Sequence, residues 1–294
     1  MSASLKAPIR PAIHRFRLGE ADVTTILDGA IVLPQVSPPY ATDMTEERRA
    51  EVAHENFVPA DKTENAFTPT LITTGGKLVV FDTGWGALGH DKGAGNLVAR
   101  MAEAGYAPED VDVLALTHCH PDHMGGLLTD GEMTFPNARH VVGRVEFEAW
   151  STGEGIPEKR AHNKELFDKI VAPVADRFDL IEGGAEIAPG LFAEEGFGHS
   201  PGHMMYRLDQ GKDQLLVWGD VTNHYAFSLR HPRAAIAFDD HPEAATATRL
   251  RVLDMVATDR ILVAGHHMPF PSVGYVEATG DSYRWVPLTY QNWI

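Results

Sequence analysis

The feature that most constrains this chain is an HxHxDH motif within the run Thr117-His118-Cys119-His120-Pro121-Asp122-His123. The first two histidines are two residues apart on an extended segment, so both project to one side, whereas the residue after each projects away. Neutral imidazoles placed in this way can share one ion such as zinc. The Asp-His pair that ends the motif follows at a turn, which directs it toward a second ion. An HxH pair alone also arises by chance in solvated loops, but the whole motif is far more specific and predicts a metal site.

Further candidate ligands follow later in the chain. His203 comes directly after the Pro-Gly turn of His199-Ser200-Pro201-Gly202-His203 and before an apolar run. Asp220 supplies a carboxylate whose two oxygens could bridge two ions, and Gly265-His266-His267 closes the set. Taken singly, His203 fits a structural role equally well, and Asp220 could be a helix cap. After the HxHxDH motif and in this order, they predict one dinuclear site.

Cys119 and two other histidines have less certain roles. Cys119 is the only cysteine, so no intrachain disulfide can form. Because it faces away from its neighbours, we expect a small buried side chain rather than a nucleophile or ligand. His224 follows Asp220 by four residues, and both a substrate contact and a core role stay open for it. The role of His199 also stays open.

Short apolar runs alternate with helical periodicity, which favours an α/β or α+β layered fold. A hairpin is expected where residues 68–72 and 77–82 flank Gly75-Gly76. Residues 13–32 are expected to form strands around a turn at Asp28-Gly29. Further strands are expected at 111–116, 140–142, 204–208, 215–218 and 261–264, and helices at 96–104 and 242–259. The candidate ligands follow the ends of these strands, where rigid scaffolds usually carry their chemistry.

The chain is expected to form one domain over residues 1–294, because it contains no repeats, low-complexity tracts or long linker. An inserted helical cap is expected at about 147–178. Its large aromatic residues, Trp150, Phe167 and Phe178, are predicted to pack in the core rather than to line a pocket.

The net charge of the chain limits the classes of binding partner that we expect. The 25 basic and 41 acidic side chains give a formal net charge of −16, which disfavours nucleic acid and anionic membranes. Two bound divalent cations would neutralise part of this net negative charge. Residues 1–17 contain no signal-peptide core, and no apolar run reaches the roughly 18–20 residues of a membrane span, so we expect a cytoplasmic protein.

In their order, the HxHxDH motif, the later histidine, the aspartate and the final histidine resemble those of the metallo-β-lactamase superfamily. The resemblance spans residues 68–271 and implies a four-layer αβ/βα sandwich with a dinuclear metal site at one edge. It also implies that Asp82, in Asp82-Thr83-Gly84, supports the ligand loop rather than binding metal; an ordinary turn is the alternative.

The run from His267 to Tyr275, with residues 283–287, is similar to the methyl parathion hydrolase branch of that superfamily, which also holds lactonases. Residues 15–33 and the helix after Phe238-Asp239 share this similarity. In that branch the ligand histidine lies three residues before the Phe of a His-x-x-Phe-Pro run, which implies His267. His266 is then expected to face the opposite side. Those hydrolases are usually exported, and no leader is visible here.

The predicted activity is that of a hydrolase with two divalent ions, Zn²⁺ first, with Mn²⁺, Fe²⁺ or Co²⁺ as alternatives. The predicted ligands are His118, His120, Asp122, His123, His203, Asp220 and His267, with Asp122 and Asp220 also catalytic. Two such ions lower the pKa of a shared water and stabilise the charge of the transition state. Asp122 is expected to take a proton as the leaving group departs.

The expected substrate is a small ester-like molecule, a lactone or aryl ester, with organophosphate triesters as a secondary class. Thioester hydrolysis of the glyoxalase II kind, β-lactam hydrolysis and an inactive metal-stabilised binding protein stay open as alternatives. RNA cleavage is disfavoured by the acidic charge. The oligomeric state stays open, with a homodimer suggested only by analogy with relatives.

Overall fold

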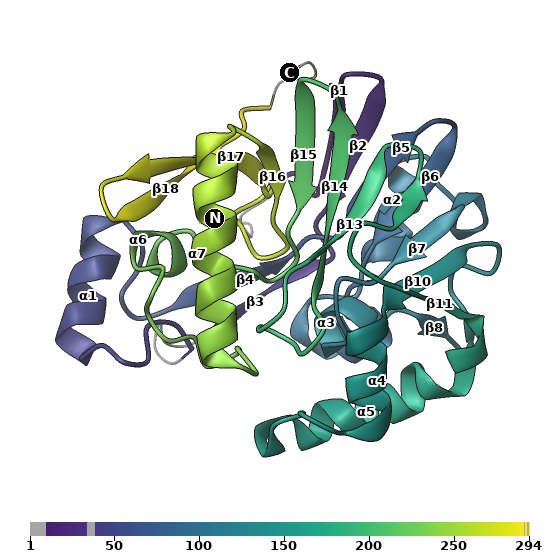
Figure 1. Ribbon diagram of the computed structural model, residues 1–294, viewed down its shortest axis with the longest axis horizontal. Helices are drawn as coiled ribbons and strands as arrows, with labels where there is room; N and C mark the ends of the chain where they lie inside the picture. Colours follow the sequence, from purple (N-terminus) through teal and green to yellow (C-terminus); the bar gives the residue numbers. More distant parts are fainter. Residues whose placement is uncertain (1–9, 34–38, 291, 293) are drawn as a thin grey trace, which may run out of the picture.

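The computed structural model describes residues 10–33, 39–290, 292 and 294. Two seven-stranded sheets form the centre of the molecule, and helices cover their outer faces (Figure 1). In spatial order, the first sheet consists of β1 (Ile13–Leu18), β2 (Ala21–Ile26), β5 (Thr70–Thr74), β6 (Lys77–Phe81), β7 (Val113–Ala115), β10 (Arg139–Gly143) and β11 (Phe178–Ile181). The second consists of β12 (Glu186–Ala188), β13 (Leu191–Glu195), β14 (Met204–Gln210), β15 (Asp213–Val217), β16 (Leu262–Ala264), β17 (Val273–Thr279) and β18 (Ser282–Pro287).

Two small two-stranded sheets and seven α-helices complete the described part of the chain. The two-stranded sheets are β3 (Gly29–Leu33) with β4 (Thr63–Phe67), which lie on either side of α1 in the chain, and the hairpin of β8 (Leu128–Thr129) with β9 (Glu132–Met133). The helices are α1 (Glu46–Glu55), α2 (Leu97–Glu103), α3 (Pro121–Met124), α4 (Arg144–Thr152), α5 (Ala161–Ile170), α6 (Phe227–Arg230) and α7 (Pro242–Thr258). Short 3-10 turns occupy Gly86–Lys92, Pro108–Asp110, Glu158–Arg160 and Ala172–Arg177.

Burial alternates along the strands and defines four layers. In β6, Val79 and Phe81 lie in the core between the two sheets, whereas Leu78 and Val80 lie in the core that α2, α4 and α5 cover. In β15 the alternation is the same, with Leu216 packed against α7. Sheets that are apolar on both faces need a layer of helices on each outer side. The four-layer αβ/βα architecture predicted for this chain is therefore confirmed.

Parallel pairing brings distant loops to one edge. β6, β7, β10 and β11 pair in parallel, as do β15 and β16. The carboxyl ends of the parallel strands in each sheet lie at one edge, and there the chain continues into residues 82, 117–123, 219–220 and 265–267. β14 runs antiparallel to β15, so the loop that precedes it reaches the same edge.

The expected hairpin and both expected helices are present, with ends shifted by one or two residues. The prediction of a turn at Asp28-Gly29 is wrong. The turn between β1 and β2 is at Gly19-Glu20, and β3 pairs with β4 rather than with β2. The physical reason is that the Asp28 carboxylate is buried and accepts the backbone N–H groups of three residues, Trp85, Gly95 and Leu97.

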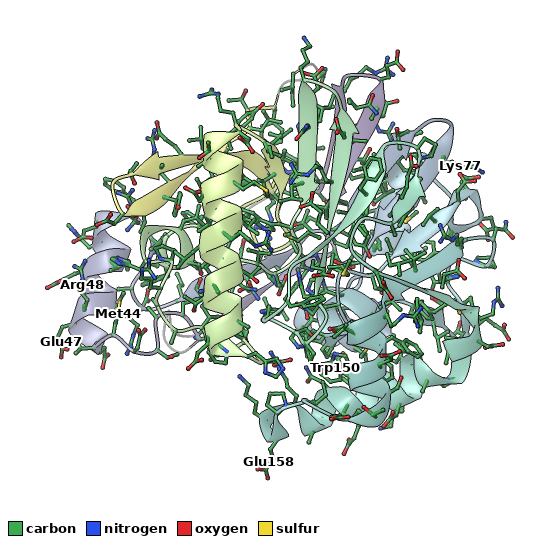
Figure 2. All side chains as sticks on the ribbon, in the orientation of Figure 1. Met44, Glu47, Arg48, Lys77, Trp150 and Glu158 are labelled. Atoms are coloured by element: carbon green, nitrogen blue, oxygen red, sulfur yellow. The ribbon has the colours of Figure 1, made fainter. Side chains whose placement is uncertain are left out.

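The segment expected as a helical cap is helical, and it begins at Arg144 with α4. Trp150 and Phe167 are fully buried in the core on the outer face of the first sheet, as expected for packing residues. Figure 2 labels Trp150 beside α4 and Glu158 at the outer tip of the segment, in the turn before α5. None of the helices in the described ranges is both long and apolar enough to cross a membrane. The expectation about a leader rests partly on residues 1–9, which lie outside the described residues.

Candidate metal centre

The HxHxDH motif begins at His118, three residues after the end of β7, and its loop is hydrogen-bonded to the loop that follows β6. The carboxylate of Asp82 accepts from the backbone N–H of Thr117 at 2.7 Å and from its hydroxyl at 2.9 Å. Asp82 also accepts from His123 Nδ1 at 2.8 Å, and it belongs to none of the candidate metal-binding groups of the described residues. This geometry agrees with the expected supporting role of Asp82.

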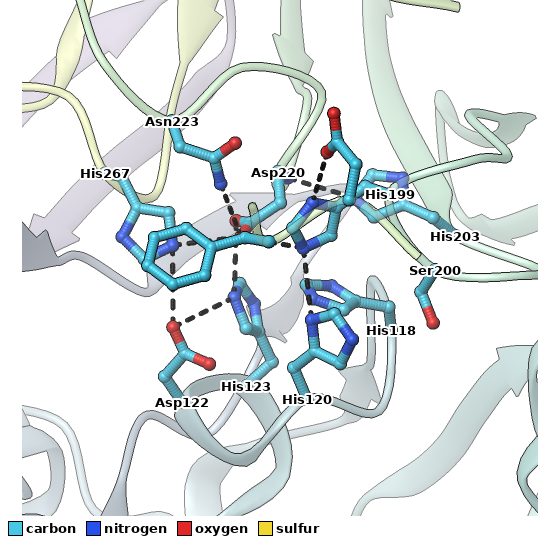
Figure 3. Close-up of polar contacts among 12 residues, drawn as sticks. His118, His120, Asp122, His123, His199, Ser200, His203, Asp220, Asn223 and His267 are labelled. Atoms are coloured by element: carbon cyan, nitrogen blue, oxygen red, sulfur yellow. Dashed lines mark hydrogen bonds and ion pairs between the residues drawn. The ribbon is translucent and has the colours of Figure 1, made fainter. Parts of the chain in front are cut away.

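Histidine nitrogens and carboxylate oxygens gather into three overlapping groups within 4.8 Å of one another (Figure 3). The groups are His118, His120 and His199; His118, His123 and Asp220; and Asp122, His123, His266 and His267. All of these side chains except that of Asp122 are buried. Six of the seven predicted ligands therefore belong to these groups, and His203 is the exception.

Asp220 lies between the groups. Its Oδ1 is 3.3 Å from His123 Nε2, and its Oδ2 is 3.2 Å from His199 Nε2 and 3.0 Å from His267 Nε2. One carboxylate thus contacts nitrogens from every group, which is the position that a bridging ligand needs.

The outer contacts of the histidines fix which nitrogen faces the centre. A carboxylate or carbonyl oxygen can only accept, so the ring nitrogen beside it carries the proton and the other nitrogen holds a lone pair. Asp240 accepts from His120 Nε2, Asp239 from His199 Nδ1, and the carbonyl of Ala66 from His267 Nδ1. Asp82 does the same for His123 Nδ1.

The inner nitrogens consequently face one another as lone pairs. When both imidazoles are neutral, His120 Nδ1 and His199 Nε2, 3.1 Å apart, face each other as lone pairs. The buried atoms His118 Nε2, His123 Nε2 and Asp220 Oδ1 have no hydrogen-bond partner. Facing acceptors are unfavourable unless a cation lies between them. Imidazole nitrogens with carboxylate oxygens form a donor set that zinc accepts, so these residues fit a pair of divalent ions.

Electrostatics differ within the cluster. Burial lowers the pKa of His120 to about 4, which leaves its imidazole neutral. Burial also opposes charge on His199, but the carboxylates of Asp220 and Asp239 raise its pKa to about 9. Burial likewise disfavours the charged form of Asp220, yet the histidines around it hold its pKa well below the usual range. A positive charge is thus favoured between Asp220 and His199, and either a proton on His199 or a bound cation supplies it.

The assignment of His203 as a ligand needs correction. Its Nε2 accepts from the backbone N–H of Asp220 at 3.0 Å, so that nitrogen is not directed at an ion. A Cβ at Gly219 would lie 2.4 Å from the same nitrogen, and one at Gly196 would lie 2.8 Å from Nδ1, so the ring is packed tightly between two glycines. We therefore assign the ligand role to His199, before the Pro-Gly turn rather than after it.

His266 also differs from expectation. Instead of facing the opposite side, its ring lies 4.1 Å from that of His123, and it belongs to the same group as His267. Strict alternation fails because residues 266–267 lie in a turn after β16 rather than in the strand. His267 is still the better ligand candidate of the two. Its Nδ1 is hydrogen-bonded to the carbonyl of Ala66, and its Nε2 lies 3.0 Å from Asp220 and 3.5 Å from Asp122.

The remaining candidates, Cys119 and His224, make contacts that support the fold. Cys119 is buried in the core under the helices, and burial raises the pKa of its thiol, as expected for a residue that is not a nucleophile. His224 Nδ1 accepts the backbone N–H groups of Ala226 and Phe227 at the start of α6. His224 lines a neighbouring cavity of about 350 Å³ rather than the one beside Asp220.

Asp239 and Asp240 were not identified from the sequence. An acidic pair just before a helix is the usual signature of a helix start, so their contacts to His199 and His120 gave no separate signal. Glu146 was missed for a similar reason, since a glutamate in the first turn of α4 is ordinary.

A cavity of about 230 Å³ opens onto the metal-binding residues. Its apolar wall consists of Ile31, Leu33, Phe67, Trp85 and Phe238. Asn65, Arg160 and Asn163 add hydrogen-bonding groups, and Asp122, with 16% of its side chain exposed, lies at the inner end with Asp220 and His267. The site can therefore hold a small molecule with an apolar part and a few polar atoms.

Fold and site together define a two-sheet αβ/βα protein with a buried histidine–aspartate centre for divalent metal. The chain belongs to the metallo-beta-lactamase superfamily, whose family model matches residues 68–266. Among curated proteins, it is 28% identical to an N-acyl homoserine lactonase of Bacillus thuringiensis over 58% of this chain and 61% of that protein. It is 30% identical to the N-acyl homoserine lactonase AttM of Azorhizobium caulinodans over 52% and 54%. The chain thus spans less than two thirds of the length of these relatives.

Two solved structures are similar along nearly their whole length. One is AidC, a dizinc quorum-quenching lactonase in complex with a product, N-hexanoyl-L-homoserine, with a TM-score of 0.88, 22% identity, and coverage of 96% of this chain and 99% of that one. The other is AbOPH, a hydrolase in the beta lactamase superfamily, with a TM-score of 0.88, 25% identity, and coverage of 97% and 100%.

Proposed function

We propose that this protein is a dinuclear zinc hydrolase that opens lactone rings. The observation that carries the proposal is the position of Asp220, whose two oxygens contact His123, His199 and His267 from all three ligand groups. The relatives support the same reading, since the curated ones are N-acyl homoserine lactonases and AidC is a dizinc lactonase. The metal ligands proposed are His118, His120, Asp122, His123, His199, Asp220 and His267.

Ions held by these residues would supply hydroxide from water at neutral pH and polarise the carbonyl of the lactone. The chain itself binds and orients the substrate. The apolar wall, which includes Ile31, Leu33 and Phe67, receives the hydrocarbon part of the substrate, and Asn65 and Asn163 lie where they can hydrogen-bond its polar atoms. Asp122 lies at the inner end of the cavity, and its carboxylate is placed to carry a proton to the ring oxygen as the carbon–oxygen bond breaks. The product is a hydroxy acid.

Asp220→Asn tests the proposal most directly. The amide removes the charge shared between the ligand groups, so we expect zinc affinity and kcat to fall together, the latter on the order of 10²-fold or more, since even outer contacts of metal ligands are worth about 10–100-fold. Zinc content by elemental analysis and hydrolysis of N-hexanoyl homoserine lactone provide the two measurements. Wild-type zinc content and rate in this variant would show that Asp220 is only a turn residue.

A substrate panel separates lactonase from the alternatives. We expect hydrolysis of the acyl homoserine lactone and of an aryl ester in the zinc-loaded protein, and loss of both after chelation. Weaker cleavage of an organophosphate triester is expected. Cleavage of a cephalosporin or of a glutathione thioester without lactonase activity would overturn the assignment. Zinc binding with no turnover of any substrate would favour a metal-stabilised binding protein.

A further inference from the structure

Two consecutive carboxylates each join a histidine of the first ligand group to an arginine. Asp240 accepts from His120 Nε2 at 3.1 Å through one oxygen and from Arg160 Nε at 2.6 Å through the other. Asp239 accepts from His199 Nδ1 at 3.1 Å and from Arg249 Nη2 at 2.6 Å. Both carboxylates are buried, so each depends on its arginine to offset the cost of desolvation.

The two arginines differ in their surroundings. Arg249 is fully buried on α7 and also donates to the carbonyls of Val221 and Pro232, which makes it part of the core. Arg160 keeps 15% of its side chain exposed and lines the 230 Å³ cavity. It belongs to the α4–α5 segment (Arg144–Arg177) rather than to either sheet.

The α4–α5 segment is fastened to the loop before α7 at two successive residues. Lys159 Nζ donates to the carbonyls of Ala237 (2.9 Å) and Asp239 (2.6 Å). Arg160 donates to the carbonyl of Phe238 as well as to the Asp240 carboxylate. The adjacent side chains of Lys159 and Arg160 therefore hold the loop before α7 in place. The carboxylates of this loop orient His199 and His120.

We propose that Arg160 is a positioning residue of the metal centre as well as a wall of the substrate cavity. Through Asp240 it holds the His120 ring with Nδ1 directed at the ion, and its exposed edge contacts the substrate. The segment that shapes the cavity thereby also sets the affinity for metal. This inference rests on the proposed function, because it assumes that His120 is a ligand.

The test compares Arg160→Gln, Asp240→Asn and the double variant with the wild-type protein. Arg207→Gln is a matched control, since Arg207 pairs with Glu194 and has 16% of its side chain exposed, but lies on β14 away from the cavity. Zinc affinity is measured by competition with a chromogenic chelator, and KM and kcat are measured with N-hexanoyl homoserine lactone. Thermal melting at saturating zinc verifies that each variant is folded.

We expect both single variants to bind zinc about 10-fold more weakly or worse, the range found for outer contacts of metal ligands. The double variant should be no weaker than Asp240→Asn, because both residues act through one chain of contacts. KM should rise in Arg160→Gln and not in Asp240→Asn. Should Arg160→Gln fail to fold, Arg160→Lys keeps a cation beside Asp240, and it should retain most of the zinc affinity while raising KM.

Zinc affinity in Arg160→Gln or Asp240→Asn equal to that of Arg207→Gln would overturn the inference, as would losses that add in the double variant. A wild-type protein that binds no zinc and opens no lactone would instead overturn the proposed function.

Discussion

At the scale of single residues, the position of the proton on each imidazole ring indicates which histidines can bind metal. The number of histidines alone does not. His120, His123, His199 and His267 each donate one ring N–H outward, to carboxylates or a carbonyl, and turn a lone pair inward. Such outer contacts orient a ligand and raise its basicity. His203 lacks this arrangement, because its Nε2 accepts a backbone N–H and its Nδ1 has no partner.

The first prediction separates His199 from His203. His199→Ala removes an inner lone pair, so we expect the protein to lose zinc from the first ligand group and most of its activity. His203→Ala leaves every proposed ligand in place but opens a void beside Gly219, so it should keep two zinc ions and melt at a lower temperature. Zinc content and thermal melting measured on both variants provide the check. Loss of zinc only in His203→Ala would restore the sequence-based assignment.

The second prediction concerns the adjacent pair His266 and His267. His267→Ala should lose zinc and activity, because His267 Nε2 faces both Asp220 and Asp122. His266→Ala should retain both ions, although a reduced rate is expected from a ring packed against His123. Elemental analysis of the two purified variants gives the answer, and the reverse pattern would transfer the ligand role to His266.

At the scale of elements, the site depends on how loops from different strands are tied together. Glu146, in the first turn of α4, is fully buried and joins two of these loops. Its carboxylate accepts from the backbone N–H of Cys119 and of Gly202, each at 2.8 Å, and from the Ser200 hydroxyl at 2.6 Å. The indole N–H of Trp150 donates to it as well, at 2.8 Å. One side chain thus fixes the HxHxDH loop relative to the loop that carries His199.

The third prediction follows from this arrangement. Glu146→Ala leaves two buried backbone N–H groups without acceptors, and each such group costs about 1–3 kcal/mol. We expect the free energy of unfolding to fall by about 2–6 kcal/mol, with weaker zinc binding as the loops separate. Glu148→Ala is the matched control on the same helix, since its side chain is 60% exposed. Equal stability of the two variants in urea denaturation would contradict this role.

At the scale of the whole molecule, the metal centre lies where the ends of strands from both sheets meet, in a chain with a formal net charge of −16. Inward-facing lone pairs and carboxylates make this edge costly to bury without cations. Bound ions should therefore be part of the stability of the fold as well as of its chemistry.

The fourth prediction is that the purified protein holds two zinc ions per chain and loses stability when they are removed. A free metal concentration of about 100 times Kd stabilises the folded protein by about 2.7 kcal/mol per site. We expect a strong chelator to lower the melting temperature by about 5 °C or more, given roughly 2–4 °C per kcal/mol for chains of this size class. Differential scanning calorimetry with and without chelator measures the shift. Less than one ion per chain after growth with added zinc, with activity intact, would refute a dinuclear site.

Several expectations remain predictions. These are the cytoplasmic location, the homodimer, the single domain over residues 1–294 and the choice of zinc over manganese, iron or cobalt.

The sequence by itself indicated a metal site built from histidines and aspartates, and it located most of the strands that precede these residues. HxHxDH, Asp220 and the final histidine pair each follow a short apolar run, and local periodicity is enough to locate such runs. Only the tertiary structure decided which histidines turn inward. His199 and His203 flank one Pro-Gly turn, and their directions depend on Gly219, Asp220 and Asp239, which come from loops elsewhere in the chain. The roles of Glu146, Asp240 and Arg160 were hidden for the same reason: each acts through contacts with residues 27 to 120 positions away, and no local pattern records them.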